Sequence, residues 1–141
     1  MCSSDLFPSH DRGRGRDVLN ITDEKATGYT MANATIKNIE TITIKGAAAV
    51  TADVSGSNIT GLETLNVTKA TQTKDTTAVS VTAAATTDVN VSGVTLATNN
   101  TTATNLIDIT GGKTVTVNQA LGDKFSRIDV DKAVKAYHVL L

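Results

Sequence analysis

In this 141-residue chain, the acidic residues are the ones whose type and spacing could support chemistry. Glu40 and Glu63 stand at the same place in two similar stretches, NIETITIKG and GLETLNVTK. Two acidic residues could bind a cation, or act as general acid and base if they converged in a groove. We expect instead two solvated carboxylates on neighbouring turns of a repeat, close to Lys37 or Lys45. The remaining carboxylates considered are scattered along the chain: Asp53, Asp88, Asp108 and Asp123.

Other reactive residues are sparse. His10 and His138 are the only histidines, and each lies in a terminal segment, which makes a Ser-His-Asp or histidine-metal site improbable. A single cysteine, Cys2, allows no disulfide within the chain. The GGK stretch at 111–113 lacks the rest of a phosphate loop and predicts a simple turn. We therefore expect no catalytic residues, no enzyme activity and no organic cofactor.

The elements that carry these residues repeat with a regular period. Five triplets of apolar, polar and apolar residues recur: LNI, ITI, LNV, VNV and VTV, with central residues Asn20, Thr43, Asn66, Asn90 and Thr116. A second series lies between them: AVTADV at 49–54, VSV at 79–81 and IDI at 107–109. Regular repetition over about a hundred residues indicates stacked supersecondary units, each holding about two strands.

The pattern favours an all-β fold, a parallel β-solenoid of four or five coils with about 23–28 residues per coil. A helical fold is disfavoured because Thr and Val dominate and no segment sustains a 3.6-residue face. An antiparallel meander stays open, although the Asn-Gly and Asp-Gly hairpin turns are absent. The expected inward residues are Ile42, Ile44, Leu65, Val67, Val89, Val91, Val115 and Val117, and the expected outer polar row is Thr43, Asn66, Asn90 and Thr116. Ile39 and Leu62 break the alternation, which predicts a bend that turns them inward as well.

Composition agrees with a narrow core. Thr occurs 25 times, Ala 17 and Val 14, whereas Trp is absent and Phe and Tyr occur twice each. The net charge of -1 gives no strong attraction to nucleic acid or anionic lipid, and no run of apolar residues is long enough to span a membrane. We expect neither nucleic-acid binding nor membrane insertion.

Three segments are expected. Residues 1–16 read as a disordered lead-in, within which MCSSDL at 1–6 resembles a translated sequencing-library adapter, so that the chain would be a metagenomic fragment. Residues 17–119 form the solenoid. Residues 120–141 form a cap or a truncated segment, in which Asp131 could cap a short amphipathic helix with Val134, Tyr137 and Leu141 on one face.

The stretch RGRGRDVLN at 12–20 resembles the Gly-Gly-x-Gly-x-Asp-x-apolar-x nonapeptide of the repeats-in-toxin family, matching at Gly13, Gly15, Asp17 and Leu19. NIETITIKG, GLETLNVTK and TTDVNVSGV resemble the Thr- and Ala-rich β-strand-repeat region of bacterial surface-layer and repeats-in-toxin-type secreted proteins. The resemblance implies a large extracellular protein that assembles or adheres at the bacterial cell surface with Ca²⁺. It also implies half of a calcium site at Gly13, Gly15 and Asp17, although Arg12 replaces the first glycine and neighbouring arginines would repel a cation.

Three functional hypotheses follow. The first is a non-catalytic structural or adhesive module of a secreted surface-layer-like protein, an adhesin that acts by self-association or by binding other cell-surface components. The second is a secreted β-helix enzyme active on polysaccharides, or the non-catalytic part of a secreted hydrolase. The third is the shaft of a phage tail fibre or an autotransporter, which would share the same fold.

Overall fold

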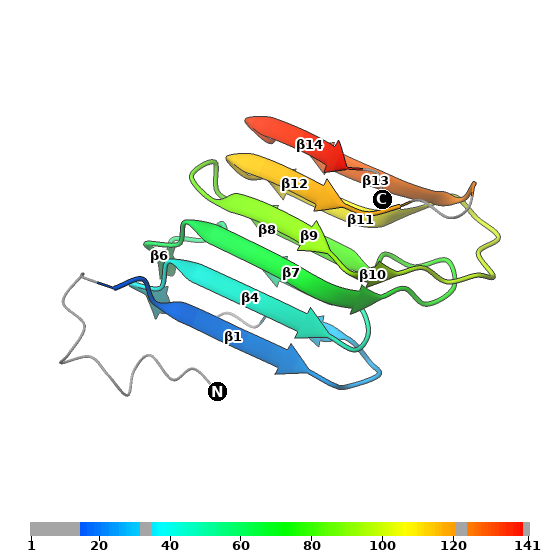
Figure 1. Cartoon of the computed structure of the whole chain (residues 1–141), viewed down its shortest axis with the longest axis horizontal. Helices are drawn as coiled ribbons and strands as arrows, with labels where there is room; N and C mark the ends of the chain where they lie inside the picture. Colours follow the sequence, from blue (N-terminus) through cyan, green and yellow to red (C-terminus); the bar gives the residue numbers. More distant parts are fainter. Residues whose placement is uncertain (1–14, 32–34, 121–123, 140–141) are drawn as a thin grey trace.

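The computed structural model describes residues 15–31, 35–120 and 124–139. These residues form fourteen strands and no helix, wound into a parallel β-solenoid of about five coils. Figure 1 shows the coils stacked in chain order, from β1 at one end of the rod to β14 at the other. Every strand pairing among these residues is parallel, so the predicted fold class is confirmed and the antiparallel meander is excluded.

The larger sheet contains the predicted first series of triplets. Its main path runs β1-β4-β7-β9-β12-β14, and the short β10 pairs with the end of β7. Thr43 pairs with Asn66 and Asn66 with Asn90, which places the expected outer polar residues in one row. The strands are β1 (Val18–Asp23), β4 (Thr41–Gly46), β7 (Thr64–Thr71), β9 (Asp88–Ser92), β10 (Val94–Thr95), β12 (Thr114–Asn118) and β14 (Lys135–Val139).

The second sheet contains the second series, in the order β13-β11-β8-β5-β2. Register partners here are less evenly spaced: Val50 pairs with Val79, 29 residues on, whereas Ile107 pairs with Ile128, 21 residues on. Coil length therefore varies more than predicted, because the turns that join the strands differ in length. The strands are β2 (Tyr29–Thr30), β5 (Val50–Asp53), β8 (Val79–Ala83), β11 (Thr104–Gly111) and β13 (Ser126–Asp131), and a third sheet pairs β3 (Ile36–Lys37) with β6 (Ile59–Thr60).

The core lies between the two larger sheets and consists of stacked β-branched and aliphatic side chains. Alternation along each strand sends every second residue inward, so equivalent positions on successive coils lie on top of one another. All eight residues predicted to face inward are buried: Ile42, Ile44, Leu65, Val67, Val89, Val91, Val115 and Val117. The second sheet adds a matching inner row: Val50, Ala52, Val79, Val81, Ile107 and Ile109.

The break in alternation marks a corner of the coil, as predicted. Ile39 and Leu62 are only 2% and 7% exposed, although neither belongs to a strand. The residue before each one has a left-handed backbone, with φ of 57° at Asn38 and 85° at Gly61. Asn and Gly are the residues that tolerate this conformation, and it turns the chain so that the next side chain points into the core.

The predicted carboxy-terminal helix is wrong. Residues 126–139 form β13 and β14, joined by a turn in which Lys132 has a left-handed backbone with φ of 59°. Val134 and Tyr137, expected on the apolar face of the helix, are 64% and 55% exposed. Instead, β14 pairs with β12 and β13 pairs with β11, and these pairings supply the backbone hydrogen bonds. The spacing of apolar residues by three and four positions, on which the helix was predicted, carries no information about such pairings. Leu141, the third residue of that face, lies outside the described residues.

Candidate functional site

The Gly- and Asp-containing stretch begins the first corner of the coil. Gly13 lies outside the described residues, Gly15 is exposed and Asp17 is half-buried. The backbone N–H of Asp17 donates to Oε2 of Glu40 at 2.7 Å, and the carbonyl of Asp17 accepts from the backbone N–H groups of Glu40 and Thr41. Asp17 is therefore held to the next coil through its backbone.

Glu40 and Glu63 lie on adjacent coils, as the repeat predicts, and the backbone N–H of Glu63 donates to the carbonyl of Glu40 at 2.9 Å. Their carboxylates have different partners. That of Glu40 accepts the Asp17 N–H, whereas that of Glu63 forms an ion pair with the guanidinium of Arg16. The hydrogen bond and charge of Glu63 raise the pKa of Arg16. Arg16, rather than Lys37 or Lys45, is thus the cation at this corner.

The hydrogen-bonding role of Asp75 was not predicted from the sequence. Its carboxylate accepts hydrogen bonds from the backbone N–H groups of Thr101 and Thr102, at 2.7 and 2.9 Å, and from the hydroxyl of Thr101 at 2.8 Å. These bonds, led by those from the two backbone groups, hold the pKa of Asp75 well below its usual range. Asp75 also has a left-handed backbone, with φ of 55°. The carboxylate therefore ties together two long turns on successive coils.

Buried amides continue that connection inside the turns. The side-chain Nδ2 of Asn100 donates to Oε1 of Gln72 at 3.1 Å and to Oγ of Ser126 at 3.4 Å, while Asn100 Oδ1 accepts the backbone N–H of Asp75. The spacing is 28 residues from Gln72 to Asn100 and 26 residues from Asn100 to Ser126. Because both spacings are close to the repeat period, the period could have identified these residues from the sequence. Gln119 makes a similar pair of bonds with the backbone of Val94. These polar side chains are buried and hydrogen-bonded, as interior amides must be.

The outer polar row also links coil to coil. Asn90 Nδ2 donates to Asn66 Oδ1 at 2.9 Å, and Asn66 Nδ2 donates to Thr43 Oγ1 at 3.4 Å. Thr116 follows Asn90 in the ladder. The predicted row is therefore present and is joined by its own side chains across three coils.

The histidines and the GGK stretch make no reactive constellation among the described residues. His138 Nε2 lies 2.7 Å from the carbonyl oxygen of Gln119, and His10 lies outside the described part of the chain. Gly111 and Gly112 have φ of 85° and 97°, so GGK forms the predicted turn. Within the described ranges, no group of three or more His, Cys, Asp and Glu side chains could hold a metal ion.

The arrangement defines a repeat scaffold whose polar side chains bond mainly to neighbouring coils. No protein-family model, curated protein or solved structure matches the chain. Among the described residues, none belongs to a helix that is long and apolar enough to cross a bilayer.

Proposed function

We propose that the chain is a non-catalytic structural or adhesive repeat module of a large secreted, surface-layer-like bacterial protein, acting outside the cell or at its surface. The observation that carries this proposal is the outer row in which Thr43, Asn66 and Asn90 hydrogen-bond to one another across coils. A solenoid presents such a row as an extended, regular surface, which suits contact with another extended structure.

The carboxylates support the same proposal. Glu40, Glu63, Asp75 and Asp88 are each bound to a backbone N–H group or to an arginine of another coil or turn. A general acid and base pair would instead need two carboxylates that converge on one substrate atom. These four carboxylates therefore link one coil or turn to another. Short Thr and Asn side chains fit the same role because they tolerate strands and bond to neighbours across a sheet.

Calcium assistance is a second part of the proposal, and it is supported by the resemblance at Gly13, Gly15 and Asp17. Backbone carbonyls of a glycine-rich turn and an aspartate carboxylate are oxygen ligands of the kind that Ca²⁺ prefers. Calorimetric titration of the chain with CaCl₂ tests this part by itself. We expect heat that disappears in Asp17→Asn, and absence of heat at millimolar Ca²⁺ would remove the site.

Co-sedimentation with bacterial cell envelopes tests adhesion. We expect the chain to pellet with envelopes, and we expect Asn66→Lys/Asn90→Lys to pellet less because two bulky cations interrupt the outer row. Thr51→Lys/Ser80→Lys, on the second sheet, is the matched control and should pellet like the parent. A parent chain that stays in the supernatant contradicts the adhesive role. If it also releases soluble sugars from alginate or pectate, the enzyme hypothesis replaces it.

A further inference from the structure

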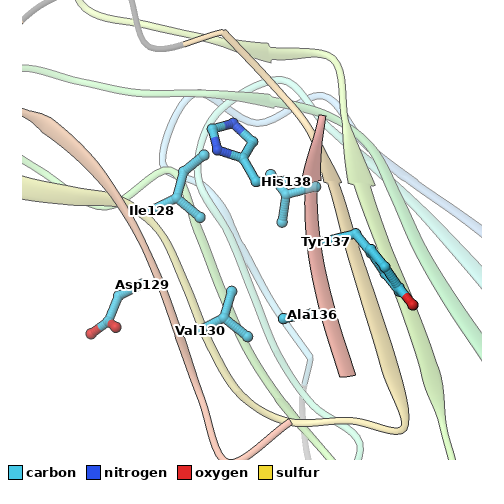
Figure 2. Close-up of a pocket in the computed structure, with 7 residues that line it drawn as sticks. Ile128, Asp129, Val130, Ala136, Tyr137 and His138 are labelled. Carbon is cyan, nitrogen blue, oxygen red and sulfur yellow. The ribbon is translucent and has the colours of Figure 1, made fainter. Parts of the chain in front are cut away.

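The last coil leaves an open hollow of mixed polar and apolar lining at the end of the rod. Figure 2 shows Ile128, Val130, Ala136 and His138 between β13 and β14. Asp129 and Tyr137 also line the hollow, and their side chains extend to its two sides. In the ladders, Ala136 follows Val115 and Ile128 follows Ile107, so the hollow continues the inner rows of the core. No described strand packs on the outer edge of β13 or β14.

The first coil offers the complementary edge. β1 and β2 each pair with a strand on one side only within the described residues, and their inward side chains include Leu19, Ile21 and Tyr29. Continuing the same ladders from the last coil of one copy would place Leu19 of a second copy over Ala136, and Tyr29 over Ile128.

The charges at one corner of the coil also differ between the two ends. Backbone hydrogen bonds link this corner from coil to coil, from Glu40 and Glu63 at the early coils to Lys113 and Lys135 at the last two. The early coils therefore carry carboxylates at this corner, starting with Asp17, whereas the last coils carry amines. Arg16, directly before Asp17, is paired with Glu63 and also interacts with the charge of Glu40, so it offsets part of the negative charge at this end. In the register that places Leu19 over Ala136, Val18 of the second copy lies over Lys135 and Asp17 lies over Val134. Lys135 of one copy is then one position from the register partner of Asp17 of the next, and their opposite charges attract.

From these apolar rows and opposite charges we infer that the two end faces bind each other in different copies, joining chains head to tail into a fibre one solenoid wide. The contact joins two different surfaces and does not close on itself, so each added copy presents a new free end. It also pairs the strand edges that the end coils expose. The inference rests on the proposed structural function and names its partner, a second copy of this chain.

Analytical ultracentrifugation and negative-stain electron microscopy over a concentration series test the inference on the 141-residue chain. We expect linear fibres whose mean length grows with concentration and falls as salt screens the end charges. Ala136→Glu should abolish fibres, because it would bury an unpaired carboxylate between copies although the position is exposed in the single chain. Tyr137→Glu, on the outward face of the same strand, is the matched control and should assemble like the parent.

Exchanging the charges of Lys135 and Asp17 distinguishes a specific contact from nonspecific association. Lys135→Glu and Asp17→Lys should each shorten fibres several-fold, and the double variant should restore them. Circular dichroism of dilute samples checks that every variant remains folded. A parent chain that is monomeric at every concentration would assign the end faces to another occupant, such as a further coil of a longer chain, and would overturn the inference. Growth that stops at dimers, or equal assembly by Ala136→Glu, would overturn it as well.

The two proposals fail in different ways. A monomeric chain that still pellets with envelopes contradicts the fibre and leaves the adhesive role intact. Fibres that do not pellet with envelopes contradict adhesion and leave the head-to-tail contact intact.

Discussion

Asn90 donates a side-chain hydrogen bond to Asn66, the residue 24 positions earlier, at 2.9 Å. The two residues are register partners on neighbouring parallel strands, and the buried Leu65 and Val89 are likewise partners in the next row of the ladder. One strand pairing therefore stacks amides on the outside and aliphatic side chains on the inside. The inner stacking repeats along the rod, and the outer row continues to Thr43 through a hydrogen bond from Asn66 at 3.4 Å.

Substitutions at adjacent positions of β7 should have very different effects. Leu65→Asp places a charge in the fully buried row and should cost more than about 4 kcal/mol, enough to unfold the chain. Asn66→Asp keeps the oxygen that accepts from Asn90 and should cost about 1 kcal/mol or less. Urea unfolding measures both, and equal losses would mean that the inside and outside of the strand are misassigned.

Removal of the buried Asn100 amide should be costly. Asn100→Ala removes one of the bonds to Gln72, which keeps those to Thr76 and Ala97, and removes the acceptor of the Asp75 N–H; it should lower the free energy of unfolding by about 2 kcal/mol or more. Asn99→Ala, at the exposed neighbouring position, is the control and should change it by less than about 0.5 kcal/mol. Thermal unfolding at neutral pH compares the two, and similar melting temperatures would argue against the amide connection.

The stability that Asp75 contributes should depend on pH in a defined direction. Hydrogen bonds to its carboxylate lower its folded pKa, so its stabilisation is fully present above the unfolded value of about 4 and is lost as pH falls toward the folded value. Asp75→Asn should therefore be less stable than the parent at pH 7, and the difference should shrink below about pH 4. Urea titrations at several pH values test this, with the exposed Asp131→Asn as control. A difference that stays constant down to pH 2 contradicts the assigned bonds.

Gly111 is required by the turn before β12. A Cβ at this position would lie 2.1 Å from the carbonyl oxygen of Ala83, and the backbone has a φ of 85°. Gly111→Ala should cost at least about 1–3 kcal/mol from backbone strain, before the clash is counted. Gly56→Ala meets nothing within 4 Å and should be neutral or slightly stabilising. Equal melting temperatures of the two variants would show that the turn is not as described.

The repeat could be predicted from the sequence because apolar and polar residues alternate locally along each strand. The triplets around Asn66 and Asn90 identify both faces of their strands, and the displaced Ile39 and Leu62 reveal the corner. Asp75 and Thr101 are 26 positions apart and Arg16 and Glu63 are 47 apart, about one and two repeat periods. The period places these residues on neighbouring coils, but it does not show that their side chains bond. These bonds depend on how long turns pack, which alternation does not encode.

The carboxy-terminal error has the same origin. Val134 and Tyr137 are three residues apart, a spacing that a helix and an irregular turn followed by a strand can both produce. The deciding interaction is the ladder between β12 and β14, and it becomes visible only when the previous coil is in place. Short terminal strands of a solenoid are therefore harder to predict than its central ones.

Cysteine cross-linking between β4 and β7 tests the central claim, the parallel register of successive coils, most directly. In a Cys2→Ser background, Thr41→Cys/Thr64→Cys and Thr43→Cys/Asn66→Cys join register partners and should form disulfides readily under mild oxidation. The crossed pairs, Thr41→Cys/Asn66→Cys and Thr43→Cys/Thr64→Cys, are separated by about 7–8 Å and should react far less. Non-reducing mass spectrometry of the monomer measures the yields. Preferential cross-linking of the crossed pairs would indicate antiparallel strands and would contradict the solenoid.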